Sequence, residues 1–224
     1  MVYALGNGGA RLLADACNGG RAINWSQKNR DAGREFLTHA LMISDIRVAL
    51  SITCRSRPDT QLRLPHELLA GMSEAIQRER DPWRTRVQCR HNDTVIDVGV
   101  VPDFAFALML PDGRRRPYVV ECDRGTMPVE RSSLLQTSIL RKFLAYETIN
   151  QRGLYRARYG WNNFRVLTIT SSGARIEKML STIRDNWFLK NSSLFLFAAM
   201  SPLMNENILE HQWISGTGKT CALI

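Results

Sequence analysis

The sequence predicts an α/β fold of three layers, in which a mixed β-sheet is flanked by helices. Short β-favouring apolar runs alternate with longer amphipathic segments. Turn sequences such as Pro111-Asp112-Gly113 join the earlier strands directly, whereas helices separate the later ones. We therefore expect the sheet to change from antiparallel to parallel pairing after the long central helix.

The first third of the chain is expected to hold the helices that precede the sheet. Residues 1 to 30 are Gly-rich and polar, and we expect them to be loosely ordered after a short extended start. Asp31 suits the N-cap of a helix that runs to about Cys54, with apolar side chains at helical spacing. Pro65 suits the first turn of a second helix, which ends before Pro82 and covers one face of the sheet.

The strands follow from alternation and from short apolar runs. From Trp83 to Cys89, apolar side chains alternate with polar and basic ones, which predicts a half-exposed strand with a basic outer face. Apolar residues at helical spacing predict two later helices, over Ser132 to Asn150 and Ala174 to Leu189. Further strands are expected over Val95 to Val101, Phe104 to Leu110, Tyr118 to Cys122, Phe164 to Thr170 and Leu194 to Ala199.

Three carboxylates are expected to meet where the two middle strands pair. Strand side chains alternate, so Glu121 and Asp123 share one face, and the turn brings Asp103 beside them. Burying like charges together is costly unless a cation or protons neutralise them. Mg²⁺ binds one or two carboxylates together with water and phosphate oxygens, so the pattern is typical of a nuclease-type metal site. Alternatively, Asp123 begins a polar turn and Glu121 pairs with an arginine.

The same stretch resembles the replication-relaxation family of plasmids and other mobile elements. The resemblance rests on Pro102-Asp103, on the run Val-Val-Glu-Cys-Asp-Arg-Gly-Thr from Val119, and on a following helix with Lys142 and Tyr146. The core of this family resembles the PD-(D/E)xK nuclease fold, which is a restriction-endonuclease-like core. The runs Tyr3-Ala4-Leu5 and Gly9 to Leu13 look like the closing wing of the winged helix-turn-helix that precedes this core in the family.

The resemblance implies a division of the chain into three parts. Residues 1–30 are a truncated winged-helix remnant, residues 31–60 a linking helix and residues 61–224 the nuclease-like α/β core. The helices of a winged helix that enter the major groove are not expected within this sequence, so we expect it to lack the usual base reader.

One departure from the nuclease pattern leaves two functions open. The position two after the Glu is normally Lys, and here it is Asp123; Lys142 on the following helix is the candidate replacement, or else an ordinary solvated charge. The first function is a DNA-binding accessory protein of plasmid or mobile-element replication, relaxation or transfer. The alternative is a DNA endonuclease in which Asp103 and Glu121 hold Mg²⁺, Asp123 supports the ion or a water, and Lys142 orients the nucleophile.

The charge of the chain favours DNA as its partner, beside other plasmid replication or transfer proteins. Lys and Arg number 30 against 21 Asp and Glu, a formal net charge of +9, and arginine suits bidentate phosphate contacts. A solvated basic surface without a ligand is the alternative. The turn that carries the arginine triplet is expected to lie next to the acidic site. The candidate DNA contacts are Arg114, Arg115, Arg116, Arg124, Arg152 and Arg156.

Several other classes of protein are excluded by what the sequence lacks. The cysteines are widely spaced without a Cys-x-x-Cys pair, which excludes a zinc knuckle. The apolar runs Phe104 to Leu110 and Leu194 to Met200 are too short to span a bilayer, so no membrane is expected and the cytoplasm is the expected location. Gly216 to Thr220 resembles a P-loop, but the first glycine of the required spacing would fall at Trp213.

Overall fold

The computed structural model describes residues 8–9, 11–12, 33–91 and 94–224. The chain divides into two compact units, residues 1–42 and 43–224. Helix α3 (Arg34–Arg55) begins in the first unit and ends in the second. The predicted N-cap Asp31 and most of the predicted wing lie outside the described residues, whereas residues 8–9 and 11–12 are helical.

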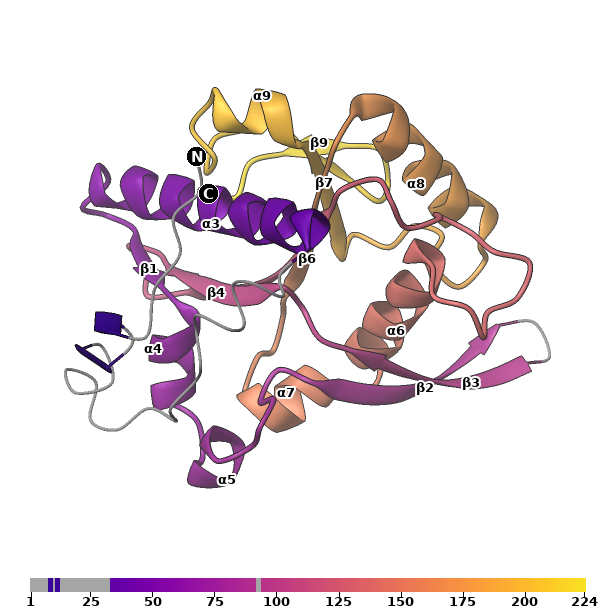
Figure 1. Cartoon of the computed structure of the whole chain (residues 1–224), viewed down its shortest axis with the longest axis horizontal. Helices are drawn as coiled ribbons and strands as arrows, with labels where there is room; N and C mark the ends of the chain where they lie inside the picture. The colour runs from indigo at the N-terminus through magenta and orange to yellow at the C-terminus, as the bar shows by residue number, and fades with distance from the viewer. Residues whose placement is uncertain (1–7, 10, 13–32, 92–93) are drawn as a thin grey trace. The chain divides into compact units, whose positions relative to one another are not determined.

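The second unit is built on a mixed sheet that, in the described part of the chain, has seven strands in the order β1-β4-β5-β6-β7-β8-β9 (Figure 1). The pair β4–β5 is antiparallel, whereas β5–β6 and β6–β7 are parallel. The predicted change of pairing after the central helix is therefore confirmed. The strands are β1 (Gln61–Arg63), β4 (Phe104–Met109), β5 (Arg115–Asp123), β6 (Arg165–Thr170), β7 (Phe195–Ala199), β8 (Trp213–Ser215) and β9 (Thr220–Cys221).

Strands β2 (Thr85–His91) and β3 (Thr94–Val100) form a separate antiparallel ribbon. Val87 and Cys89 are buried while Arg86 and Arg90 are exposed, so the predicted alternation is confirmed. The ribbon packs against helix α6 (Ile139–Gln151), as Figure 1 shows. Arg141 of α6 also donates a hydrogen bond of 3.1 Å to the carbonyl of Asp97 in β3.

Two predicted helices have different bounds in the structure. The helix expected from Pro65 is divided at Gly71 into α4 (Pro65–Ala70) and α5 (Glu74–Gln77), because glycine is a weak helix former. The central helix begins at Ile139 instead of Ser132. The Ser138 hydroxyl accepts a hydrogen bond from the Arg141 amide and caps it. The remaining helices are α7 (Leu154–Tyr159), α8 (Gly173–Asp185) and α9 (Met200–Met204).

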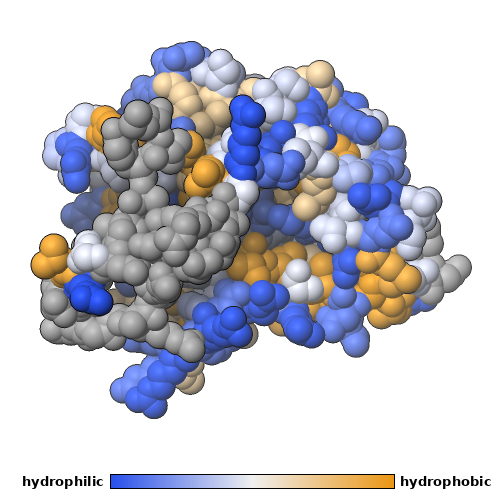
Figure 2. Space-filling model, in the orientation of Figure 1, coloured by the Kyte–Doolittle hydropathy of each residue, from blue (hydrophilic) through white to orange (hydrophobic). Residues whose placement is uncertain are grey.

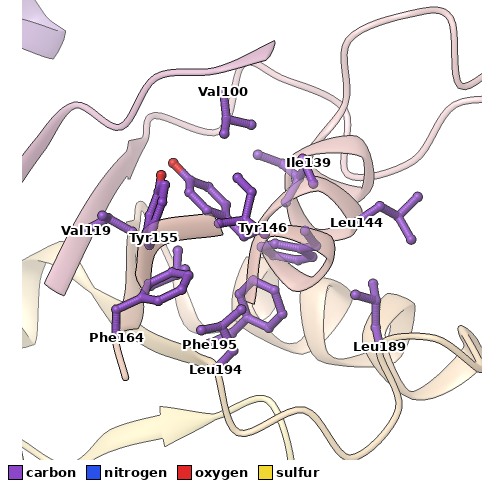
Figure 3. Close-up of a cluster of buried hydrophobic side chains, with 14 of the residues drawn as sticks. Val100, Val119, Ile139, Leu144, Tyr146, Tyr155, Phe164, Leu189, Leu194 and Phe195 are labelled. Atoms are coloured by element: carbon purple, nitrogen blue, oxygen red, sulfur yellow. The ribbon is translucent and has the colours of Figure 1, made fainter. Parts of the chain in front are cut away.

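The main core lies between the sheet and α6. Alternate strand residues such as Val119 and Phe195 face this side, and Leu144 and Tyr146 of α6 are fully buried against them (Figure 3). Helix α8 packs beside α6 and against β7 (Figure 1). The other strand residues form a second buried layer, in which the rings of Phe106 and Tyr118 stack with centroids 4.9 Å apart. Glu121 and Asp123 belong to the α6 side of the sheet.

Helix α3 is long and apolar enough to cross a membrane by length and composition, with a mean hydropathy of 1.3. This helix was predicted from the sequence over Asp31 to about Cys54, but only the shorter apolar runs at Phe104 to Leu110 and Leu194 to Met200 were compared with the thickness of a bilayer. A helix that contributes to a core passes the same test, and Ile46, Leu50 and Cys54 of α3 are buried. Val48 and Ile52 are exposed on the same helix.

The P-loop-like segment forms the turn between β8 and β9. The Ser215 amide donates to the Lys219 carbonyl at 2.7 Å, and Gly218 has a φ of 81°, which favours glycine. A Cβ on Gly216 would lie 2.7 Å from the Ser192 carbonyl oxygen.

We expect Gly216→Ala to destabilise the protein by about 1–3 kcal/mol, because backbone must move to admit the methyl group. Urea denaturation followed by circular dichroism measures the effect. Gly173→Ala is the matched control, since a Cβ there meets nothing within 4 Å. Equal free energies of unfolding for the two variants would show that the backbone around Ser192 moves to admit the methyl group without a loss of stability.

Candidate functional site

Asp103 and Glu121 lie side by side where β4 begins and β5 ends. The register pairs Phe104 with Val120, so the preceding residue, Asp103, stands opposite Glu121. The Asp103 amide donates to the Val120 carbonyl at 2.9 Å, and the Cys122 amide donates to Asp103 Oδ2 at 2.6 Å. These two hydrogen bonds hold the Asp103 carboxylate against the end of β5.

Glu121 is buried, and two residues of α6 use both of its oxygens. Lys142 Nζ lies 2.5 Å from Oε2, and the Tyr146 hydroxyl donates to Oε1 at 2.5 Å. Lys142 and Tyr146 are four residues apart and therefore occupy the same face of the helix. Burial raises the pKa of Glu121, and the Lys142 ammonium only partly offsets this. Burial lowers the pKa of Lys142, but the charge and hydrogen bond of Glu121, together with the charges of Asp103 and Asp123, outweigh burial, so its pKa is raised and it stays protonated.

Asp123 has a different partner, Arg175 in the first turn of α8. The guanidinium makes two contacts, one from Nε to Oδ2 and one of 2.9 Å from Nη2 to Oδ1. The Thr170 hydroxyl donates to Oδ2 at 2.6 Å, and the Gly125 amide donates to Oδ1 at 3.2 Å. Burial alone would raise the pKa of Asp123. The hydrogen bonds from Arg175 and Thr170 outweigh burial, so the pKa is lowered and the carboxylate is ionised.

Glu121 and Asp123 are thus paired with cations of the protein itself. Mg²⁺ needs carboxylate oxygens that are free to coordinate it, whereas both oxygens of Glu121 and both of Asp123 accept hydrogen bonds. Within the described residues, no group of three or more His, Cys, Asp or Glu side chains is arranged to hold a metal ion. The side chains as they stand do not fit a bound Mg²⁺.

The arginine triplet is not next to the acidic site, contrary to expectation. Strand β5 starts at Arg115 and reaches Glu121 only six residues later, which at about 3.3 Å per residue is about 20 Å. The turn before β5 therefore lies at the opposite end of the β4–β5 hairpin from Asp103. The prediction failed because it used closeness in sequence, whereas an extended strand separates its two ends in space.

The other predicted DNA contacts are spread over the surface. Arg124 directly follows Asp123 and is half-buried, so it lies at the acidic end of β5. Arg152 is exposed at the C-cap of α6, and Arg156 is exposed on α7. The exposed Arg152 and Arg156 are available to phosphate, but they do not form one site with the acids.

Sequence reasoning missed Arg175 and Thr170, which lie on α8 and at the end of β6. Neither position carries a local signal, because the contacts join residues 52 and 47 positions apart. Lys142 was identified as the candidate lysine, and it is the residue that lies against Glu121. Tyr146 was named as part of the family pattern and of the predicted helix, but not as a residue of the site.

Comparison with known proteins identifies one family. A family model described as replication-relaxation matches residues 1–164, a range that includes Asp103, Glu121, Asp123 and Lys142 and ends before Arg175. No curated protein and no solved structure matches the chain. The family match covers well over half of the chain. The chain therefore belongs to the replication-relaxation family.

Proposed function

We propose that this protein is a DNA-binding accessory factor that acts in the replication, relaxation or transfer of a plasmid or mobile element. Membership of the replication-relaxation family indicates a role in replication or relaxation of such an element. The proposed partners are DNA and other replication or transfer proteins, and the proposed place of action is the cytoplasm. In this proposal the nuclease-like core is a platform for DNA that does not cut it.

We favour a DNA-binding platform over a nuclease because the buried acids are already paired with cations of the protein. Glu121 is neutralised by Lys142 and Asp123 by Arg175, so neither acid needs an outside cation to be buried. Removing one partner of such a buried pair is costly, so each pair holds its acid at the end of β5 without any ligand. The acids therefore have a structural explanation that does not involve hydrolysis.

The surface charge supports DNA as the ligand. The chain has a net charge of +9, and arginine binds phosphate through its planar fork. Figure 2 shows strongly hydrophilic side chains distributed over the visible face of the molecule. Binding through phosphate contacts is expected to weaken steeply as the salt concentration rises.

A metal-dependent DNA endonuclease is the second candidate, and one observation favours it. Lys142 Nζ lies 2.5 Å from Glu121, beside Asp103, although it comes from the helix and not from the strand. Asp103 and Glu121 would have to exchange their present hydrogen bonds for the metal. This candidate predicts cutting that depends on both acids.

Cleavage and binding of the same supercoiled plasmid separate the two candidates. With Mg²⁺ or Mn²⁺ present, we expect salt-sensitive binding without nicking. Glu121→Gln should change the affinity less than twofold, because the carboxylate is buried and faces Lys142. The control is Glu177→Gln, which removes one negative charge from an exposed position on α8.

Nicking by the wild type that disappears in Glu121→Gln but not in Glu177→Gln would replace the platform with the endonuclease. Absence of binding to any DNA, at low salt and with a folded protein, would reject both candidates. A thermal melt of each variant checks that Glu121→Gln remains folded.

A further inference from the structure

A basic groove lies at the end of the sheet where β5 and β6 begin, opposite the end that carries Glu121 and Asp123. Its volume is about 770 Å³, and it is bounded by the start of β5, by the loop between α7 and β6 and by β9. Tyr118 of β5 pairs with Arg165 of β6, so side chains from two neighbouring parallel strands meet there. Its polar lining residues are Arg114, Arg115, Arg116, Asn162, Asn163 and Arg165.

The charges of this groove have one sign. Arginine is the charged residue type that lines it, at four positions, and none of the described residues along it is acidic. Asp112 lies nearby on the turn and pairs with Arg114, so that guanidinium is partly neutralised. The remaining arginines leave an excess of positive charge in a recess, where field lines concentrate and anions are attracted.

Several of these donors are available to a ligand. The Arg165 side chain is exposed and makes no hydrogen bond or ion pair with any residue that the structure describes. Arg115 is exposed and donates a long hydrogen bond of 3.4 Å to the Gly160 carbonyl. Asn162 and Asn163 are exposed beside them and can add amide donors. Arg116 donates from Nη1 to the Leu223 carbonyl at 2.8 Å, so it also holds the wall of the groove.

The aromatic rings at the groove are not available for stacking. Trp161, Tyr118 and Phe164 are only 2%, 3% and 4% exposed. Trp161 packs against the rings of Tyr155 and Tyr159 in the core. Proteins that recognise bases in single strands stack them on exposed aromatic rings. A ligand in this groove would therefore be held by its charges and not by its bases.

We propose that the groove binds the phosphodiester backbone of a single DNA strand, independently of base sequence. The proposal rests on the proposed DNA-binding function and assigns that function a place. A DNA duplex is a rigid rod with its phosphates on a convex surface, so it contacts the rim of the groove and does not enter it. A flexible single strand can enter the recess and bring adjacent phosphates to Arg115 and Arg165.

Binding of a labelled 20-nucleotide oligothymidine to the full-length protein, measured by fluorescence anisotropy over a range of salt, tests the assignment. We expect Arg115→Ala/Arg165→Ala to weaken binding about tenfold and to reduce the salt slope by about 1.4, for two lost phosphate contacts on a single strand. The matched control, Arg80→Ala/Arg184→Ala, removes the same charge from exposed positions outside the groove. It should change the affinity less than threefold.

The possible outcomes separate this inference from the function on which it rests. If the wild type binds no DNA, single or double, the proposed function fails and the inference fails with it. If the wild type binds DNA but both double variants bind equally well, DNA binding stands and the groove is not the site. A duplex of the same length that binds more tightly, and loses as much affinity in the groove variant, would overturn the assignment to a single strand.

Discussion

Arg175→Met is expected to lower the free energy of unfolding by about 3–5 kcal/mol, because it leaves the buried Asp123 carboxylate without its cation. Both side chains are largely inaccessible to solvent, with 6% of Asp123 and 15% of Arg175 exposed. Solvent therefore screens the pair only weakly. The measurement is equilibrium unfolding in urea at pH 7.

The control for this variant is Arg184→Met, which removes an exposed guanidinium from the last turn of the same helix. It should change the stability by no more than about 0.5 kcal/mol. Asp123→Asn/Arg175→Met should recover part of the loss, since the charge that needed a partner is gone. A loss below about 1 kcal/mol in Arg175→Met would show that Thr170 and Gly125 suffice to hold Asp123.

The Asp123–Arg175 pair also predicts how the stability of the protein depends on pH. The pKa of Asp123 is lowered from its ordinary 3.8, so its contribution is present above pH 3.8 and is lost as the pH falls through the folded-state pKa. In Arg175→Met, the guanidinium no longer counteracts the effect of burial, so the pKa of Asp123 should rise. The variant should then lose less stability than the wild type between pH 5 and pH 3.

Lys142→Met is expected to destabilise the protein by about 3 kcal/mol at pH 8 and by clearly less at pH 5. Glu121 is the cause, because it would keep the Tyr146 hydrogen bond but lose the ammonium that offsets its burial. Its folded-state pKa is already raised above 4.5 and should rise further. A group with a raised pKa contributes most below its unfolded pKa, and this contribution is lost as the pH rises through the folded-state pKa.

Urea unfolding at pH 5 and pH 8 measures this difference. In Glu121→Gln/Lys142→Met, the loss of stability should be nearly the same at pH 5 and pH 8, because the titrating Glu121 carboxyl is gone. Lys178→Met, an exposed position on α8, is the control and should be nearly neutral at both pH values. Equal destabilisation of Lys142→Met at pH 5 and pH 8 would contradict the role given to Glu121.

Much of the sheet could be predicted from the sequence because burial imposes a period on the chain. Strand β4 was expected over Phe104 to Leu110 and runs from Phe104 to Met109, since an apolar run buried on both faces leaves a clear signal. The alternation of β2 was also clear, because one face is buried and the other is exposed. The change to parallel pairing followed from the helix between β5 and β6.

The start of α6 could not be predicted in the same way. Leu134 and Leu135 continue the helical spacing backwards from α6, which suggested a start at Ser132. In the structure Leu135 is 75% exposed, and the segment before α6 is irregular. The Ile139 amide donates to the Pro128 carbonyl, a contact that is possible only once that segment folds back on itself. Helical spacing describes a face and does not say where that face ends.

The sequence by itself determined the family and the meeting of Asp103 with Glu121, because a strand pair and its turn are local features of the chain. Only the tertiary structure decided how the acids are neutralised. Lys142 reaches Glu121 across 21 residues, and Arg175 reaches Asp123 across 52. The energy of a buried charge depends on whatever lies within a few ångströms, and separation along the chain does not determine that distance once the chain folds.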